Sequence, residues 1–416
     1  MKINGLVACA FLLSSGSASA FSQFSPVFPI GHEAVTVLGS HNSLGYRSLP
    51  KPTLTMHQKS ESAHCWTKYG ATDPRLCAVV LGNRWVDIMG FNVAPGTSDF
   101  KCFQAVAQDQ DKIMYDHFLR MERDLGETGR TDALNGGVAT YKYLVNMAVN
   151  SLETWTSSIT DGGIIREVYH DVPMSYFLLG RAMHLLQDSF STEHATRLTK
   201  WDSQGRAISS IVVDVASYRC MSDVYQEHSH EFQSRELEKI YRAQDFLTGS
   251  HHAEHGDIIW NKGVTNVEQT QLAAMLKGDT RNVPYISTYV KRAAVDAVFA
   301  TADLFDTFLS ARLARVQGRK DIADKVIAAH VDRWFTRAKK GMPVTHTAAD
   351  VAKCKKGGVM GPMEDQSTIG RRRDACLLQT CPDGKKRSDG TPCTNSLPNE
   401  KHKPPFSWIG KVDDIK

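Results

Sequence analysis

Several common signatures of catalytic and metal-binding sites are missing from this chain of 416 residues. It has no G-x-S-x-G element, which disfavours a serine hydrolase of the α/β type. The stretch "HEAVT" ends at Thr36, where a zincin motif H-E-x-x-H needs its second histidine. No C-x-x-C pair occurs, which disfavours the competing hypothesis of a zinc site made of cysteines. Any metal in this chain is therefore expected on histidine and aspartate.

Long hydrophobic runs and a strong net charge are also lacking. Residues 1–20 have the pattern of a secretory signal, with Lys2, an apolar run over 6–13 and small residues before a cleavage site. The mature protein is then expected to begin at Phe21 and to be secreted, to the periplasm or beyond. No later run is long enough for a transmembrane anchor. The net charge of +4 is too small to indicate nucleic-acid binding, but it permits contact with an anionic membrane.

Nine cysteines are present, and eight remain once Cys9 leaves with the signal. An even number in a secreted chain predicts disulfides. These eight are Cys65, Cys77, Cys102, Cys220, Cys354, Cys376, Cys381 and Cys393.

Hydrophobic periodicity divides the mature chain into two domains. Apolar residues recur at three- and four-residue spacing from about 112 to 340, with the longest run over 285–316, so we expect an all-α helical bundle. Residues 21–110 are richer in turn-forming residues, which predicts long loops covering that bundle. Residues 341–416 are expected to form a small, basic, disulfide-rich domain. Its runs "GRRRDAC" and "DGKKRSDG" are either a solvated face or an attachment site for phospholipid headgroups.

The stretch "MHLLQDSFSTEH" places ligand-type residues inside an apolar helical run. His184 and Asp188 lie four residues apart and therefore share one helix face. A neutral imidazole and an ionised carboxylate on one face are suited to a metal ion, and His194 follows just beyond the helix. The alternative is a His–Asp hydrogen bond in the core, with His194 on the surface.

Other histidines and carboxylates occur in similar settings. His32 in "FPIGHEAVT", Asp87 in "NRWVDIMGF" and His117 in "MYDHFLRM" each have apolar neighbours. Further along, "YQEHSHEFQ" offers His228 and Glu231 three residues apart on an expected helix, with His230 as a competing ligand.

The H-x3-D-x5-H element in "FLLGRAMHLLQDSFSTEHATR" resembles the zinc-dependent phospholipase C family, and "LLQDSFSxxH" looks most like its secreted bacterial branch. That family shares its helical fold with zinc-dependent single-strand nucleases. The resemblance covers roughly residues 30–240. It implies three clustered zinc ions in an all-α domain spanning 21–340, lipid degradation, and a role in virulence.

The resemblance also assigns roles to individual residues. His184 and Asp188 match the central histidine and the bridging aspartate, and His194 matches the histidine of a neighbouring zinc. His32, Asp87 and His117 match further ligands by order and local context. The family's final pair, a histidine followed by a carboxylate on a helix, is most like His228 with Glu231. Relatives begin with a tryptophan whose main chain binds zinc, whereas the expected mature chain begins with Phe21.

Clustered zinc ions lower the pKa of bound water and stabilise a phosphoryl transition state. We therefore expect zinc-bound hydroxide to attack phosphorus, with Asp87 as base or orienting carboxylate. The products expected from a membrane phospholipid are diacylglycerol and a phosphorylated headgroup such as phosphocholine. Two alternatives stay open, namely a nuclease of the same fold and a non-catalytic protein that binds membranes through its basic tail.

Overall fold

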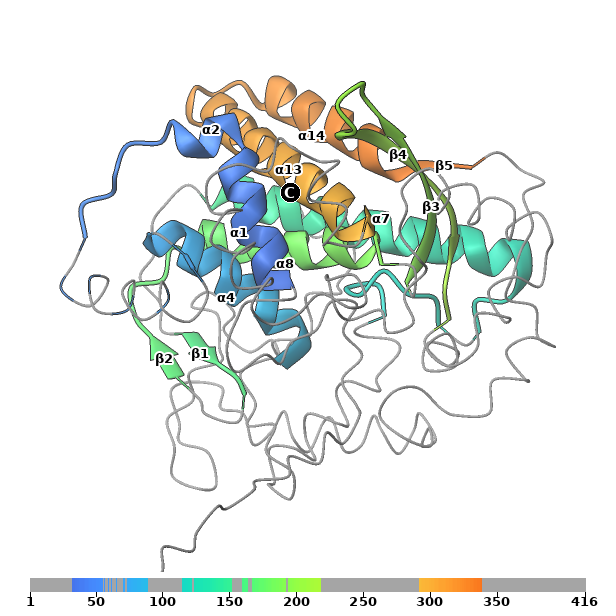
Figure 1. Ribbon diagram of the computed structural model, residues 1–416, viewed down its shortest axis with the longest axis horizontal. Coiled ribbons are helices and arrows are strands. Elements are labelled where there is room, and N and C mark those ends of the chain that lie inside the picture. Colours follow the sequence, from blue (N-terminus) through green and yellow to red (C-terminus); the bar gives the residue numbers. More distant parts are fainter. Residues whose placement is uncertain are drawn as a thin grey trace, which may run out of the picture.

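The computed structural model of this chain describes residues 32–54, 56, 59, 61, 65, 70–71, 73–88, 114–121, 123–151, 159–163, 167–191, 194–217 and 292–338. Figure 1 shows the helices and strands in these residues. The helices are α1 (His32–Asn42), α2 (Leu44–Arg47), α4 (Pro74–Ile88), α7 (Gly126–Asn150), α8 (Met174–Asp188), α13 (Arg292–Val316) and α14 (Lys320–Phe335). The strands are β1 (Ile159–Asp161), β2 (Glu167–Tyr169), β3 (Ala195–Trp201), β4 (Ala207–Val215) and β5 (Thr336–Arg337).

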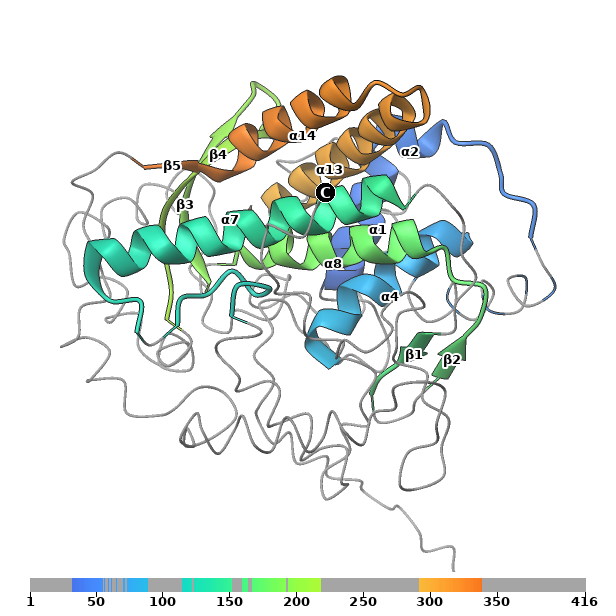
Figure 2. The ribbon, with the colours of Figure 1, turned by 180° about the vertical axis from the view of Figure 1, so that it is seen from behind.

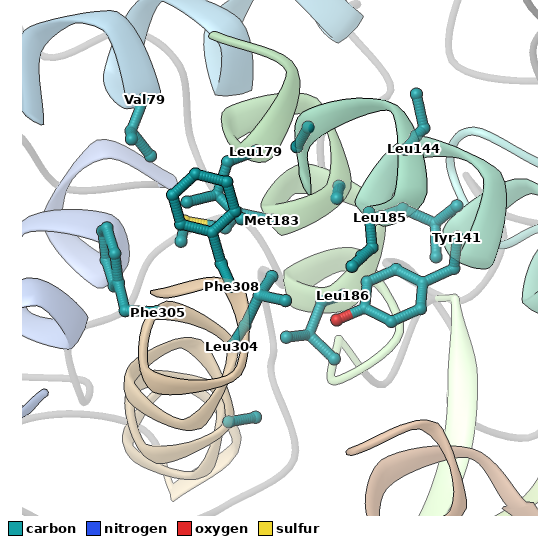
Figure 3. Close-up of a cluster of buried hydrophobic side chains, with 14 of the residues drawn as sticks. Val79, Tyr141, Leu144, Leu179, Met183, Leu185, Leu186, Leu304, Phe305 and Phe308 are labelled. Atoms are coloured by element: carbon teal, nitrogen blue, oxygen red, sulfur yellow. The ribbon is translucent and has the colours of Figure 1, made fainter. Parts of the chain in front are cut away.

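Helix α8 is the centre of the helical body. All of its residues are buried, which agrees with the apolar helix expected over this stretch. It contacts α1, α4, α7 and α13, and α7 runs alongside it in Figure 2. Figure 3 shows the packing around it, with Leu185 and Leu186 near Tyr141 of α7, and Leu179 and Met183 near Phe308 of α13. A helix enclosed in this way can hold polar groups away from water.

Two glycines allow α4 and α8 to meet backbone against backbone. A Cβ atom added at Gly82 would lie 1.9 Å from the carbonyl oxygen of Phe177. A Cβ atom added at Gly180 would lie 2.0 Å from the carbonyl oxygen of Val79. Because a main chain cannot move aside as a side chain can, these positions exclude any larger residue. The C-terminal halves of both helices are thereby held close together.

The all-α expectation is wrong, because a mixed three-stranded sheet packs beside the helices. Strands β3 and β4 form an antiparallel hairpin, and β5 pairs in parallel with β4. Strands β1 and β2 form a second, two-stranded sheet. The hairpin has its own sequence signal, since "DSQGR" is a turn and "SIVVDV" is rich in β-branched residues. The general helical periodicity of the surrounding segments concealed it.

The expectation of long loops over 21–110 is also wrong for the part that the structure describes. Helices α1, α2 and α4 all lie in this range. Nearly all described side chains of α1 and α4 are buried, so neither helix has the polar face that produces a clear amphipathic pattern. Glycines at helix contacts, such as Gly82, further lowered the helical signal.

One of the expected disulfides is confirmed. Cys65 is bonded to Cys77, which lies in α4. The other six cysteines, the signal over 1–20 and the C-terminal domain over 341–416 lie outside the described residues. Within the described residues, no helix combines the length and the apolar character needed to cross a bilayer.

A buried polar contact joins the hairpin to α13. Asp296 accepts a hydrogen bond from Trp201 Nε1 at 2.9 Å and pairs with Arg292 Nη2 at 2.9 Å. Burial raises the pKa of Asp296 to about 6, although Arg292 and Trp201 oppose this shift. The folded protein therefore binds this proton more tightly than the unfolded chain, in which the pKa of aspartate is about 3.9.

This contact predicts a specific pH dependence of stability. The contribution of Asp296 is complete below about pH 4 and is lost as the pH rises through about 6, which amounts to about 3 kcal/mol. The Asp296→Asn variant lacks this titration, so its stability relative to wild type should rise by about 3 kcal/mol between pH 4 and 7. Urea unfolding at a series of pH values measures the difference. A difference that stays constant over this range would contradict the prediction.

The glycine contact predicts that Gly180→Ala destabilises the fold by about 3 kcal/mol, because the added methyl group would push α4 and α8 apart. Gly136→Ala is the matched control. Its Cβ would lie 2.4 Å from the ring of Tyr115, a partly buried side chain that can turn away. Since alanine also favours a helix by about 1 kcal/mol, the control should stay close to wild type. Urea unfolding of metal-free protein tests both, and a Gly180→Ala variant as stable as wild type would exclude the close contact.

Candidate metal centre

Segments far apart in the sequence bring ligand-type side chains to one buried point. His32 is the first residue of α1, Asp87 lies in the last turn of α4, and His117 lies in the turn over 114–118. His184 and Asp188 lie one turn apart at the end of α8. All five are at most 8% exposed. The structure thus assembles residues that the sequence linked only by order and context.

The β-hairpin holds two of the histidines in place. His194 directly precedes β3, and its carbonyl oxygen accepts a hydrogen bond from the amide of Ala216 at 2.7 Å. The carbonyl of Ala216 in turn accepts from the amide of Arg120 at 2.9 Å, which binds the His117 segment to the end of β4. His194 Nδ1 donates to the carbonyl oxygen of His117 at 2.5 Å. The sheet that the sequence reading missed therefore positions part of the centre.

Three donor atoms, from His117, His184 and Asp188, lie close enough together to share one ion, and Asp87 Oδ1 lies near the two histidines. His184 Nε2 lies 3.0 Å from Asp188 Oδ2, 3.4 Å from Asp87 Oδ1 and 3.2 Å from His117 Nδ1. His117 Nδ1 lies 3.0 Å from Asp188 Oδ2 and 3.7 Å from Asp87 Oδ1. Two ligands of a tetrahedral zinc ion, with bonds of about 2.0–2.1 Å, are separated by about 3.3 Å. The donor separations fit that geometry.

Asp188 serves both sides of the cluster. Its Oδ2 faces His117 and His184, while its Oδ1 lies 3.1 Å from His32 Nε2. His32 also stacks on His184, with ring centroids 4.1 Å apart. His32, Asp87 and His184 form a second set of possible ligands, but His184 Nε2 has one lone pair and can bind only one ion. Asp188 is therefore the natural bridge between its set with His117 and His184 and the His32 side of the cluster.

The buried Nε2 atom of His194 has no hydrogen-bond partner among the described residues. Its Nδ1 is the donor to His117, so Nε2 carries a lone pair. A buried polar atom normally has a partner, because leaving it without one costs about 1–3 kcal/mol. A ligand for a positive ion is the role that this lone pair fits.

The electrostatics of the cluster suit a cation. Burial alone would raise the pKa of Asp188, but the charges of His184 and His194 and hydrogen bonds from His117 and His184 hold it well below its usual range. Burial opposes the charged form of His32, yet its contacts with Asp188 raise the pKa of this histidine to about 9. A cation among these groups would compete with such protons, so its binding should release them.

Two polar residues behind the candidate ligands were not predicted from the sequence. Gln187 Oε1 lies 2.9 Å from His32 Nδ1, and Asn83 Oδ1 lies 3.4 Å from His184 Nδ1. Metal-binding histidines usually donate their second N–H group to such an acceptor. The available signal was an amide inside an apolar helical run, in "VLGNRW" and "HLLQDSF".

A buried ion-pair network fixes the start of α1. Arg84 of α4 is hydrogen-bonded to Glu33 and lies 3.0 Å from Asp161 Oδ1 in β1. Glu33 directly follows His32. The network therefore restricts where the His32 ring can lie relative to α4.

The last pair of expected ligands, His228 and Glu231, lies outside the described residues, as do His230 and Phe21. The other six, His32, Asp87, His117, His184, Asp188 and His194, all belong to the cluster.

Comparison with known proteins finds a distant relative. Hemolysin-1 of Aeromonas salmonicida is 28% identical over 281 residues, which is 66% of this chain and 42% of that protein. The chain thus matches less than half of the relative's length. A hemolysin as relative is consistent with the expected role in virulence. No protein-family profile matches the chain, and no solved structure matches it significantly.

The cluster predicts that Asp188→Asn destabilises metal-free protein by about 3 kcal/mol near pH 6, because it leaves buried histidine charge without its counter-charge. Asp188→Glu, which keeps the charge but adds a methylene group, should also be destabilised, but with a different pH dependence. Urea unfolding between pH 5 and 8 separates lost charge from poor packing. An Asn variant as stable as wild type at pH 6 would show that the carboxylate does not compensate the histidines.

Proposed function

We propose that this protein is a secreted zinc-dependent phospholipase C that hydrolyses phosphatidylcholine-like phospholipids. The observation that carries the proposal is the buried set of His117, His184 and Asp188, with donor separations that fit one zinc ion and with Asp87 beside the two histidines. His32 and His194 supply starting ligands for two more ions. The resemblance of the H-x3-D-x5-H element to this family supports the same assignment.

The donor chemistry favours zinc over the harder cations. Calcium and magnesium prefer sites made only of oxygen, whereas imidazole nitrogen with one or two carboxylates is typical of zinc. The histidines also have the outer hydrogen bonds of zinc ligands, such as the one from His194 to the carbonyl of His117.

Phosphodiester hydrolysis needs an activated water molecule and stabilisation of charge at phosphorus. When bound, zinc supplies polarisation of phosphoryl oxygens and a water molecule of lowered pKa. Asp87 is the most exposed of the cluster residues at 8%, which supports its assignment as the residue nearest the substrate. In the proposed reaction it accepts the proton of the attacking water, whose oxygen bonds to phosphorus as the bond to the glycerol oxygen breaks. The glycerol oxygen takes up a proton, and the products are diacylglycerol and a phosphorylated headgroup.

The remaining findings bear on the location and the target of the enzyme. The Cys65–Cys77 disulfide supports secretion, because such bonds persist in oxidising compartments. The name of the relative, a hemolysin, fits an activity directed at membranes. Lipid hydrolysis is one such activity, and binding to a membrane without catalysis is another.

The proposal predicts that purified mature protein with zinc releases phosphocholine from phosphatidylcholine vesicles. His184→Ala and Asp188→Asn should each lower this rate by at least about 100-fold, because both remove a ligand of the central ion. Zinc content, measured by mass spectrometry, should fall in parallel.

His330→Asn is the matched control. His330 is as deeply buried and pairs with Asp303 at 2.7 Å and Tyr141 at 2.6 Å, but it lies outside the cluster. This variant should lose stability and keep its zinc. Hydrolysis of single-stranded DNA alone would identify a nuclease, and inactive but folded, zinc-loaded protein would favour the non-catalytic binding protein.

A further inference from the structure

We propose that Asn83 and Gln187 act as a pair of positioning residues that fix which ring nitrogen of His32 and His184 faces the metal centre. The proposal rests on the metal site of the proposed function. It assigns a role to two buried amides, one in α4 and one in α8, that are not ligands themselves.

The Gln187 amide has hydrogen-bond partners at both of its ends. Its Nε2 donates to Thr36 Oγ1 at 3.0 Å and to Thr301 Oγ1 at 3.2 Å. Its Oε1 accepts from Asn83 Nδ2 at 3.0 Å and lies 2.9 Å from His32 Nδ1. Since Oε1 can only accept, His32 must carry a proton on Nδ1. Its Nε2 is then the atom directed at Asp188.

Asn83 repeats this arrangement for the second histidine. Its Nδ2 donates to Gln187 Oε1 and, at 3.1 Å, to Thr36 Oγ1. Its Oδ1 is therefore left to face His184 Nδ1, at 3.4 Å. His184 Nε2 is the atom that points at Asp87, His117 and Asp188.

The pair joins four of the helices near the centre. Thr36 lies in α1 and Thr301 in α13, so the amides join these two helices to α4 and α8. All four side chains are 0% exposed. A buried polar network is costly if only stability is needed, since apolar side chains could fill the same space. Orientation of the two histidines gives the network a specific use.

Two substitutions at Gln187 separate positioning from simple packing. Gln187→Glu keeps an acceptor for His32 Nδ1 but loses both donors to the threonines. Gln187→Met has a similar volume and keeps neither. We expect zinc affinity, measured by competition with a chelator, to fall 10- to 100-fold in the Met variant and to stay within about threefold of wild type in the Glu variant.

Stability of the metal-free variants provides the contrast. The Met variant loses every hydrogen bond of the amide and the Glu variant buries a carboxylate, so both should unfold at lower urea concentration. If zinc affinity falls equally in both, or follows the loss of stability, the network is only structural and the proposal is wrong. Nitrogen NMR of zinc-loaded wild type gives a second test. It should show His32 and His184 protonated at Nδ1, and protonation at Nε2 would overturn the assignment.

These outcomes are separable from those of the proposed function. Zinc binding with the expected order of affinities, but without phosphodiesterase activity, would refute the enzyme and retain the amide pair. Phosphodiesterase activity with equal loss of zinc in both variants would do the reverse. Wild-type protein that binds no zinc would overturn both.

Discussion

The close approach of α4 and α8 is the constraint on which the rest of the centre depends. Gly82 and Gly180 let the two backbones touch, and this contact sets how far apart the following turns of each helix lie. Asp87 on one helix can then face His184 on the other at 3.4 Å. A larger spacing would take these two buried polar groups out of contact with each other. Small residues in the middle of the helices thus determine the chemistry at their ends.

Placing so much charge in a dry interior has a cost that the chain offsets locally. Asp87 and Asp188 contribute negative charge, and four histidines surround them within a region that is almost closed to water. Protons on groups such as His32 balance this charge when no other cation is present. The same arrangement that tolerates a proton is therefore suited to a divalent ion, and the choice between them depends on pH and on metal concentration.

The parts of the centre that sequence could predict are the local ones. His184 and Asp188 share a helix face, and their spacing together with His194 is visible without any knowledge of the fold. His32, Asp87 and His117 were matched by order and local context, and only tertiary packing brings them close. The hairpin was missed because neighbouring helical patterns dominated its region. The amides were missed because a single polar residue in an apolar run usually gives no indication of its partner.

The centre is built from segments that are very far apart along the chain. His32 meets Gln187 across 155 residues, and His117 meets Asp188 across 71. Only His184 and Asp188 can come together in a single isolated helix. An unfolded or partly synthesised chain therefore offers a metal ion no more than a weak pair of ligands. The proposed ion would therefore bind with high affinity only after the slow, long-range contacts have formed, and it would stabilise the finished fold without guiding its early steps.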